Sequence, residues 1–306
     1  AMAEMLIQTK HYKEAQDLLG EAILGSPDAR MLSLLGAIRE GLGDDGAAEQ
    51  LAAQALERAP GFAPALNLQG VLAFKRGDRD DAERRFREAA KADPSWGESL
   101  TNLGVLLWAA AEKEKSLDLL EEGFILSPCT ADLAERYHAA AVTLGVHARA
   151  EKAFRDACSL HPQNRAIAFL LIDLLISQEK HEEAMDRIEA AMAAFEVDDG
   201  FIDAALAVRQ RIGPMDIGHG KDRPTLSLCM IVKNEQANLV RCLSSVKAAV
   251  DEMIVVDTGS TDRTKDLASI FGAKVFDAPW RDDFAEARNA SLSRASGDWV
   301  LVIDAD

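Results

Sequence analysis

The chain of 306 residues is poor in aromatic side chains, which make up 6% of it, and poor in positive charge, with a formal net charge of −17. Few aromatics and abundant alanine favour closely packed helices over a β-sandwich. The acidity argues against a nucleic-acid-binding protein, because phosphate backbones attract a basic face. With 48% hydrophobic and 28% charged residues, the composition is that of a folded protein of about two domains.

Cysteine is also scarce, and long hydrophobic runs are missing. The four cysteines (Cys129, Cys158, Cys229 and Cys242) show no CxxC spacing, which predicts small buried side chains in a reducing compartment. No apolar run reaches the ~18 residues of a membrane span. The first ten residues are too polar for a signal peptide. The sequence therefore predicts a cytoplasmic protein without a membrane-spanning segment.

What the sequence does have is an internal repeat of 34 residues. Several series of prolines and small residues share this spacing: Pro60, Pro94, Pro128 and Pro162; Gly36, Gly70 and Gly104; Ala48, Ala82, Ser116, Ala150 and Ala184; and Ala55, Ala89, Gly123, Ala157 and Ala191. The steps from Pro27 to Pro60 and from Ala15 to Ala48 are 33 residues, which places a one-residue deletion in the turn just after Pro27. Turns tolerate such a change most easily.

One repeat predicts a pair of helices. Residues 65–76 and 80–92 are helical in pattern, and Gly77 breaks the run between them. Gly70 and Ala82 lack bulk where the helices cross, so the helices can approach closely there. One pair cannot bury its apolar face alone, so stacking on neighbouring pairs is required.

These residues resemble the tetratricopeptide repeat, over residues 3 to about 196, as five full repeats preceded by a partial one. The resemblance implies an all-α solenoid over residues 1–212, in which residues 197–211 form a capping helix. His138 and Ile172 stand at the glycine position of the last two repeats, where looser packing is expected.

The resemblance also implies a concave groove that binds protein or peptide. Its candidate residues are Asn67, Glu98, Asn102 and Arg136. The segment Thr101–Gly104 looks like the asparagine-bearing repeats of protein O-GlcNAc transferases, in which side-chain amides hold a peptide backbone. The alternative is that these are ordinary exposed polar positions.

Residues 213–224 hold three glycines and two prolines and predict a linker. After it, apolar strands alternate with helices, which indicates a parallel sheet over residues 225–306. The expected strands are 226–232, 253–256, 273–276 and 299–303, and the expected helices are 238–250, 261–271 and 284–295.

Polar residues follow three of these strands, at the edge where such sheets bind ligands. Asp304 and Asp306 follow the last strand in a DxD pattern, and alternation points them to the same side. Paired carboxylates suit a divalent cation, Mg²⁺ or Mn²⁺, that shares its shell with phosphate oxygens. In the turn after the second strand, Ser260 or Thr261 is expected to cap the following helix, with Asp262 at its positive end.

The second domain resembles the family 2 glycosyltransferases of the GT-A fold. The segments that carry the resemblance are Leu228–Glu235, Val255–Asp262, Trp280–Phe284 with Ala287–Asn289, and Gly297–Trp299 with Asp304–Asp306. The residues that it implies for nucleotide-sugar binding are Ile231, Val232, Lys233, Asn234, Glu235, Asp257, Thr258, Arg288, Asn289 and Asp304. It implies that Asp306 ligates the metal and that Asp304 contacts ribose or metal. Thr258 stands where the family often has a second aspartate.

The combined resemblance implies an inverting glycosyltransferase that moves a sugar from a nucleoside diphosphate donor, of the uridine type, to a protein or peptide held by the repeats. Its general base is expected beyond Asp306, so the chain is expected to be a truncated and inactive donor half. One alternative is a protein-interaction scaffold with a remnant or regulatory transferase domain. Another is a transferase with a lipid-linked or polysaccharide acceptor.

Overall fold

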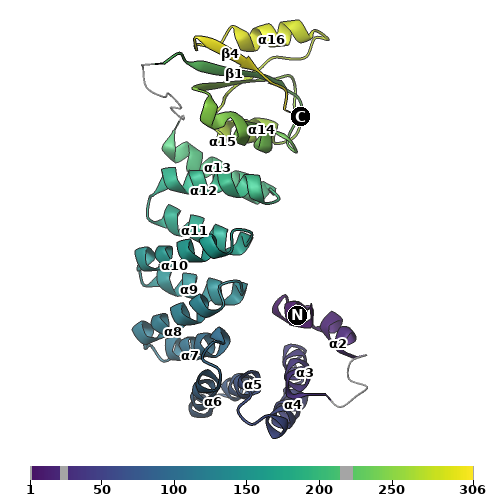
Figure 1. Cartoon of the computed structure of the whole chain (residues 1–306), viewed down its shortest axis with the longest axis vertical. Coiled ribbons are helices and arrows are strands. Elements are labelled where there is room, and N and C mark those ends of the chain that lie inside the picture. Colours follow the sequence, from purple (N-terminus) through teal and green to yellow (C-terminus); the bar gives the residue numbers. More distant parts are fainter. Residues whose placement is uncertain (1, 21–26, 214–222, 306) are drawn as a thin grey trace. The chain divides into compact units, whose positions relative to one another are not determined.

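A computed structural model describes residues 2–20, 27–213 and 223–305 (Figure 1). The chain divides into two compact units, residues 1–171 and 172–306. The division falls inside one helix, α11 (Arg165–Ser177), upstream of the segment predicted as a linker. Residues 214–222 of that segment lie outside the described residues.

The first unit is all helical, which confirms the predicted fold class for this part of the chain (Figure 1). Consecutive helices pair, and each pair packs on the next. The helices before α11 are α1 (Met2–Gln8), α2 (Tyr12–Gly20), α3 (Ala29–Gly41), α4 (Asp45–Arg58), α5 (Ala63–Lys75), α6 (Arg79–Ala92), α7 (Gly97–Ala109), α8 (Lys113–Leu126), α9 (Ala131–Thr143) and α10 (His147–Leu160).

The deletion predicted after Pro27 is visible in the helix boundaries. The first helix of a pair begins three residues after each of Pro60, Pro94, Pro128 and Pro162, but α3 begins two residues after Pro27. The shortened turn is closed by Asp28, whose side chain accepts a hydrogen bond of 2.8 Å from the Met31 N–H. An N-terminal aspartate cap therefore fixes the start of α3 despite the missing residue.

Small residues bring the two helices of a pair together, as the repeat pattern predicts. A Cβ added to Gly70 on α5 would lie 2.5 Å from the Phe86 ring on α6. Phe86 packs in a buried cluster with Ala73, Ala82 and Leu103. At the position equivalent to Gly70 in the pair α9/α10, the His138 ring lies edge-on to Phe154 with 6.0 Å between centroids.

A second repeating feature was not predicted from the sequence. The first helix of each full pair is followed by a residue with positive φ, at the same 34-residue spacing: Gly43, Gly77, Ala111, Gly145 and Glu179. Glycine adopts this left-handed conformation without a steric penalty, whereas alanine and glutamate do not. The sequence series was hidden because two of its five members are not glycine.

Ala111→Gly is therefore expected to stabilise the first unit. Ala111 has a φ of +65°, and glycine relieves its strain by about 0.5–1 kcal/mol, less the entropy that glycine adds to the unfolded chain. Urea denaturation of the variant and the unaltered protein measures the gain. Ala109→Gly, two residues earlier at the last residue of α7, is the control and is expected to destabilise by up to about 1 kcal/mol. A destabilised Ala111→Gly variant would contradict the assignment of strain.

The second unit is a four-stranded parallel sheet with helices on both faces, in the strand order β3-β2-β1-β4. Its elements are α12 (His181–Ala194), α13 (Asp199–Ile212), β1 (Leu226–Val232), α14 (Leu239–Val246), the 3₁₀ helix η2 (Lys247–Ala249), β2 (Glu252–Asp257), α15 (Thr264–Ile270), β3 (Lys274–Asp277), α16 (Phe284–Leu292) and β4 (Trp299–Val302). Order and type of the elements after residue 225 confirm the predicted α/β fold.

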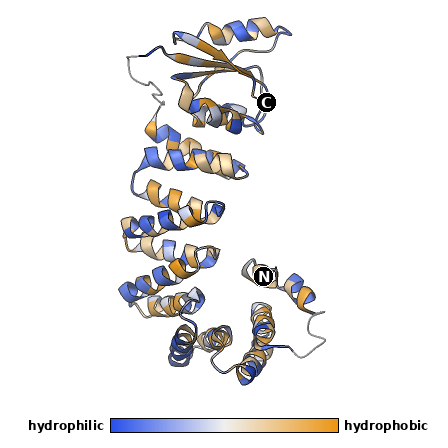
Figure 2. Ribbon diagram, in the orientation of Figure 1, coloured by the Kyte–Doolittle hydropathy of each residue, from blue (hydrophilic) through white to orange (hydrophobic). Residues whose placement is uncertain are grey.

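Helix α16 covers one face of the sheet, and α14 and α15 cover the other (Figure 1). Figure 2 shows the central strands as largely hydrophobic, as expected for strands buried on both faces. On the α16 face, Cys229, Ile254 and Val256 form a buried cluster. On the other side, α12 and α13 pack against α14 and α15, so the last two helices before the predicted linker belong to the same compact unit as the sheet.

The predicted capping of α15 by Ser260 or Thr261 is wrong, whereas Asp262 lies at the start of the helix as expected and accepts from the Thr264 N–H at 3.0 Å. This helix begins at Thr264 rather than at Thr261, and its N-cap residue Arg263 makes no side-chain capping bond. The Ser260 hydroxyl instead accepts from the Asn234 N–H, at 2.8 Å, and the Thr261 N–H donates to the Asn234 side chain, also at 2.8 Å. These residues are held by the neighbouring loop, and that competition delays the start of the helix.

Candidate functional site

Two loops meet at the carboxyl edge of the sheet, one after β1 (residues 233–238) and one after β2 (residues 258–263). Besides the two bonds made by Asn234, the Glu235 N–H donates to the Thr264 hydroxyl at 2.8 Å. The Gln236 N–H donates to Asp262 at 3.2 Å, and the Arg263 N–H donates to the Gln236 side chain at 3.1 Å. Backbone and side chains thus join the two loops into one layer, which we call the paired loops.

Asp257, the last residue of β2, fixes the start of the second of these loops by hydrogen bonds. Its side chain is buried, and its carboxylate accepts from the Gly259 N–H at 3.1 Å and the Ser260 N–H at 3.0 Å. Thr258 is also buried, and both its N–H and its hydroxyl donate to the Val232 carbonyl, at 2.9 and 3.0 Å. The carboxylate of Asp257 is therefore committed to its own turn.

The other predicted donor residues of this edge differ in exposure. Val232 is buried and Ile231 is half-buried inside β1, so these two offer backbone rather than side chain. Lys233 and Asn234 are exposed, and Glu235 is half-buried with its carboxylate accepting from the Asn238 amide at 3.1 Å. Asn234 has a φ of +56°, a conformation that asparagine tolerates better than most residues. Lys233 and Asn234 are therefore the predicted donor residues of this edge whose side chains are exposed.

A second group of predicted residues comes together from α16 and the end of β4. Arg288 Nη2 lies 3.6 Å from Asp304 Oδ1, and both side chains are partly exposed. Arg288 Nε is buried, and it has no hydrogen-bond partner among the residues that the structure describes. Asn289 is the exposed neighbour of Arg288 on α16. An arginine that keeps an unused donor beside an exposed carboxylate suits an anionic ligand with a cation nearby.

The predicted metal site is only partly described. Asp304 offers exposed carboxylate oxygens, which fit a hard divalent cation. Asp306 lies outside the described residues. Within the described ranges, no group of three or more His, Cys, Asp or Glu side chains is close enough to hold a metal ion. The metal-binding roles of Asp304 and Asp306 stay predictions.

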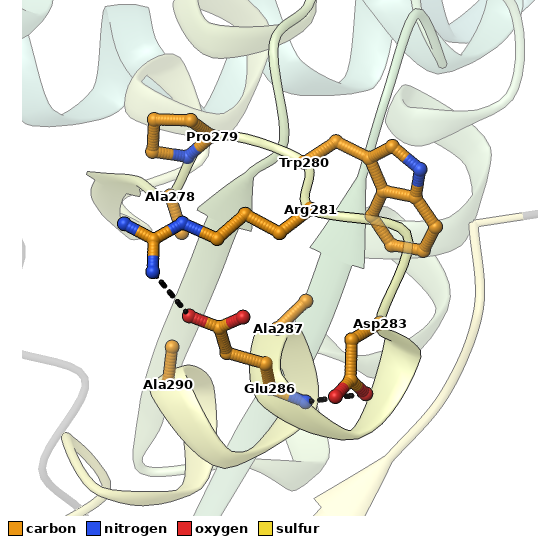
Figure 3. Close-up of a pocket in the computed structure, with 8 residues that line it drawn as sticks. All are labelled: Ala278, Pro279, Trp280, Arg281, Asp283, Glu286, Ala287 and Ala290. Carbon is orange, nitrogen blue, oxygen red and sulfur yellow. Dashed lines mark hydrogen bonds and ion pairs between the residues drawn. The ribbon is translucent and has the colours of Figure 1, made fainter.

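A hollow lies between the loop after β3 and α16 (Figure 3). Its volume is about 160 Å³, and it is lined by Ala278, Pro279, Trp280, Arg281, Asp283, Glu286, Ala287 and Ala290. Arg281 pairs with Glu286 at 3.1 Å, and Asp283 caps α16 through the Ala285 and Glu286 N–H groups. The sequence pattern gave these residues no role, because polar side chains that cap a helix and pair on its first turn look the same whether or not they border a cavity.

The four candidate peptide-binding residues lie on the first helices of consecutive repeats. The Asn102 amide donates to the Asn67 side-chain oxygen at 3.0 Å, and Asn67 is buried. Burial raises the pKa of the Glu98 carboxyl, and the Asp132 charge adds to this effect. Arg136 pairs with Asp132 at 2.6 Å. The structure brings the two asparagines together in one hydrogen bond, while a peptide-binding role for the four stays a prediction.

Among the helices of the described residues, none is long and apolar enough to span a bilayer. The cytoplasmic location stays a prediction.

Comparison with known proteins finds two families that match parts of the chain. Residues 67–123 and 140–198 match the tetratricopeptide repeat, and residues 227–306 match glycosyl transferase family 2. A TPR repeat-containing protein of Synechococcus elongatus is 57% identical over 81 residues, which are 26% of this chain and 20% of that protein. An uncharacterized glycosyltransferase of Rickettsia typhi is 44% identical over 81 residues, 26% of this chain and 27% of that one.

The prophage-derived glycosyltransferase SunS of Bacillus subtilis is 38% identical over 87 residues, which cover 28% of this chain and 21% of SunS. The chain thus spans about a quarter of the length of the curated relatives it matches. The matched family segment includes both the paired loops and the Arg288–Asp304 pair. The chain therefore carries tetratricopeptide repeats followed by a family 2 glycosyl transferase segment.

Proposed function

We propose that the chain binds a nucleoside diphosphate sugar at the carboxyl edge of its sheet, as the donor site of a glycosyltransferase, and that its repeats recruit a protein or peptide acceptor. The observation that carries the donor site is the buried Arg288 Nε without a hydrogen-bond partner among the described residues, beside the exposed Asp304. An anion that approaches this edge satisfies a donor that the described residues leave unused.

Different residues of this edge are proposed to bind different parts of the nucleoside diphosphate sugar. The paired loops form the surface for the nucleoside, with Lys233 and Asn234 as their exposed side chains. Arg288 donates to the diphosphate, and Asn289, the next residue of α16, is proposed to contact the same donor. Asp304 holds the divalent cation, Mg²⁺ or Mn²⁺, together with Asp306. When bound, this cation neutralises charge on the leaving diphosphate.

The reaction is a single displacement with inversion. A nucleophile of the acceptor forms a bond to the anomeric carbon while the bond from that carbon to the diphosphate oxygen breaks, and the acceptor proton passes to a general base. Arg288 stabilises the charge that develops on the departing diphosphate. The peptide acceptor is proposed to bind along the first helices of consecutive repeats, where the Asn67–Asn102 hydrogen bond brings two side-chain amides together.

Arg288→Ala is expected to weaken the binding of UDP in the presence of Mn²⁺ about tenfold, since a charge-assisted hydrogen bond contributes about 1.5–3 kcal/mol. Isothermal titration calorimetry measures the dissociation constant. Arg187→Ala removes an exposed arginine from α12 and is the matched control, with unchanged affinity. Asp304→Ala is expected to abolish the dependence of binding on Mn²⁺.

The competing hypothesis is a repeat scaffold whose transferase segment is a remnant. It predicts that neither UDP nor other nucleoside diphosphates bind the unaltered chain, and that outcome would reject the proposed donor site. A lipid-linked acceptor is distinguished from a peptide acceptor by presenting both to the protein with its repeats intact. Binding of the lipid-linked acceptor alone rejects the role proposed for the repeats.

A further inference from the structure

Helix α13 is tied to the N-terminal end of α15 by one arginine. Arg263, the N-cap residue of α15, places Nη2 2.5 Å from Asp203 and Nη1 3.3 Å from Asp199, both on α13. Its Nε lies 2.6 Å from Asp266 on α15 itself. The guanidinium thus bridges two helices with all three of its nitrogens.

The backbone of the same residue belongs to the paired loops. The Arg263 N–H donates to Gln236, and the adjacent Asp262 accepts from the Gln236 N–H. From there the bonds continue to Asn234, Ser260 and Thr261. The side chain of Arg263 is therefore fixed by α13 while its backbone closes the layer that carries Lys233 and Asn234.

A buried network holds α12 and α13 at the other end of α15. Glu189 on α12 is paired with Arg209 on α13 at 3.0 Å and with Lys247 of η2. Arg209 Nε also donates to the Ile270 carbonyl, at the last residue of α15, at 2.9 Å. Because Glu189 and Arg209 are both buried, this network holds α12 and α13 against the last residue of α15 and against η2. With α15 held at its far end, the Arg263 bridge sets the position of its near end.

We infer that Arg263 is a positioning residue for the donor site and that Asp199 and Asp203 on α13 set the geometry of the paired loops through it. This inference rests on the proposed function, because the paired loops are the proposed nucleoside surface. It makes the last helix before residues 213–224 a determinant of nucleotide affinity, although α13 contributes no residue to the proposed donor site.

The two carboxylates are suited to a clean test because they are exposed. The side chains of Asp199 and Asp203 are 79% and 68% exposed. Exposed ion pairs contribute little to global stability. Removing these charges should therefore alter loop geometry without unfolding the unit.

The experiment compares the full chain with its Asp199→Asn/Asp203→Asn variant, and with Glu196→Gln as the matched loss of an exposed carboxylate between α12 and α13. We expect the double variant to bind UDP with Mn²⁺ about fivefold more weakly at unchanged melting temperature. Amide hydrogen exchange at Asn234, Ser260 and Thr261 should become faster without nucleotide. The control should match the unaltered chain in both measurements, and Asp203→Glu should retain most of the affinity.

Unchanged affinity together with unchanged exchange in the double variant would overturn the positioning role. A fall in melting temperature that also accompanies Asp203→Glu would do the same, because it indicates a purely structural contact. If the unaltered chain binds no nucleotide, the proposed function fails, and the exchange measurement alone still decides whether Asp199 and Asp203 order the loops.

Discussion

Gly97→Ala is expected to destabilise the first unit by about 3 kcal/mol, the upper end of the range for overpacking. A Cβ on Gly97 would lie 2.3 Å from the Gly123 carbonyl oxygen, so α7 and α8 meet backbone to backbone. Backbone cannot rotate away as a flexible side chain can, so the added methyl group must push the two helices apart. In the repeat pattern, Gly123 stands where the other pairs have alanine, which explains why this pair is in closer contact.

Urea denaturation followed by tryptophan fluorescence measures this effect, because Trp96 and Trp108 lie at the two ends of α7. Gly46→Ala is the matched control. Gly46 is a helical glycine on α4, and an added Cβ there meets nothing within 4 Å. It is expected to leave stability unchanged or to raise it by up to about 1 kcal/mol, since alanine is the better helix former. Equal effects of the two substitutions would contradict the close backbone contact.

Glu252→Ala is expected to destabilise the second unit by about 3 kcal/mol. Its carboxylate is buried at the N-terminal end of β2 and accepts from Ser227 on β1 at 2.8 Å and from Lys274 on β3 at 2.7 Å. It also accepts from the Ser296 N–H at 2.9 Å, in the turn before β4. One side chain thus joins three strands and the turn before β4, and its loss leaves several donors without an acceptor.

The same contacts make this stability depend on pH. Burial alone would raise the pKa of Glu252, but hydrogen bonds from Lys274, Ser296 and Ser227 outweigh it and hold the pKa at about 2. A carboxyl with a depressed pKa stabilises the fold fully above its unfolded value of 4.5 and loses that contribution as the pH falls toward 2. At 1.36 kcal/mol per pKa unit, the loss amounts to about 3 kcal/mol.

Denaturation curves recorded at several pH values between 4.5 and 2 test this dependence. The Glu252→Gln variant should show a flatter decline than the unaltered chain. Asp277→Asn, an exposed carboxylate on β3 paired with Lys265 at 3.3 Å, is the control and should keep the steep decline. Parallel curves for all three proteins would show that Glu252 does not carry the acid sensitivity.

The elements of both units could be predicted because their signals are local. Prolines and small residues at fixed spacing mark the helical pairs, and the apolar run at 226–232 marks β1 with its observed limits. The start of α15 could not be predicted in this way. Ser260 and Thr261 have the chemistry of a cap, but Asn234 on another loop competes for them, and a partner 26 or more residues away leaves no local pattern.

The candidate site shows the same limit. The sequence pattern placed Asp257 and Asp304 near one edge, and the family resemblance added Arg288, but it could not show that the Asp257 carboxylate is occupied by its own turn. Nor could it show that Arg288 Nε, beside Asp304, has no hydrogen-bond partner among the described residues. The bridge from Arg263 to α13 joins residues 60 or more positions apart. The sequence predicts that these residues lie in separate domains. Tertiary hydrogen bonds decide these details.

The division of the chain inside α11 has a consequence for how such proteins can diversify. Because α12 and α13 belong to the same compact unit as the sheet, a gene fragment that begins after α13 would strip the transferase segment of the helices that cover α14 and α15. Recombination upstream of Leu171 can instead add, lose or exchange repeats while this unit keeps its contacts. The last helical pair would then act as a fixed adaptor, inherited with the sheet, to which different numbers of helical repeats are joined.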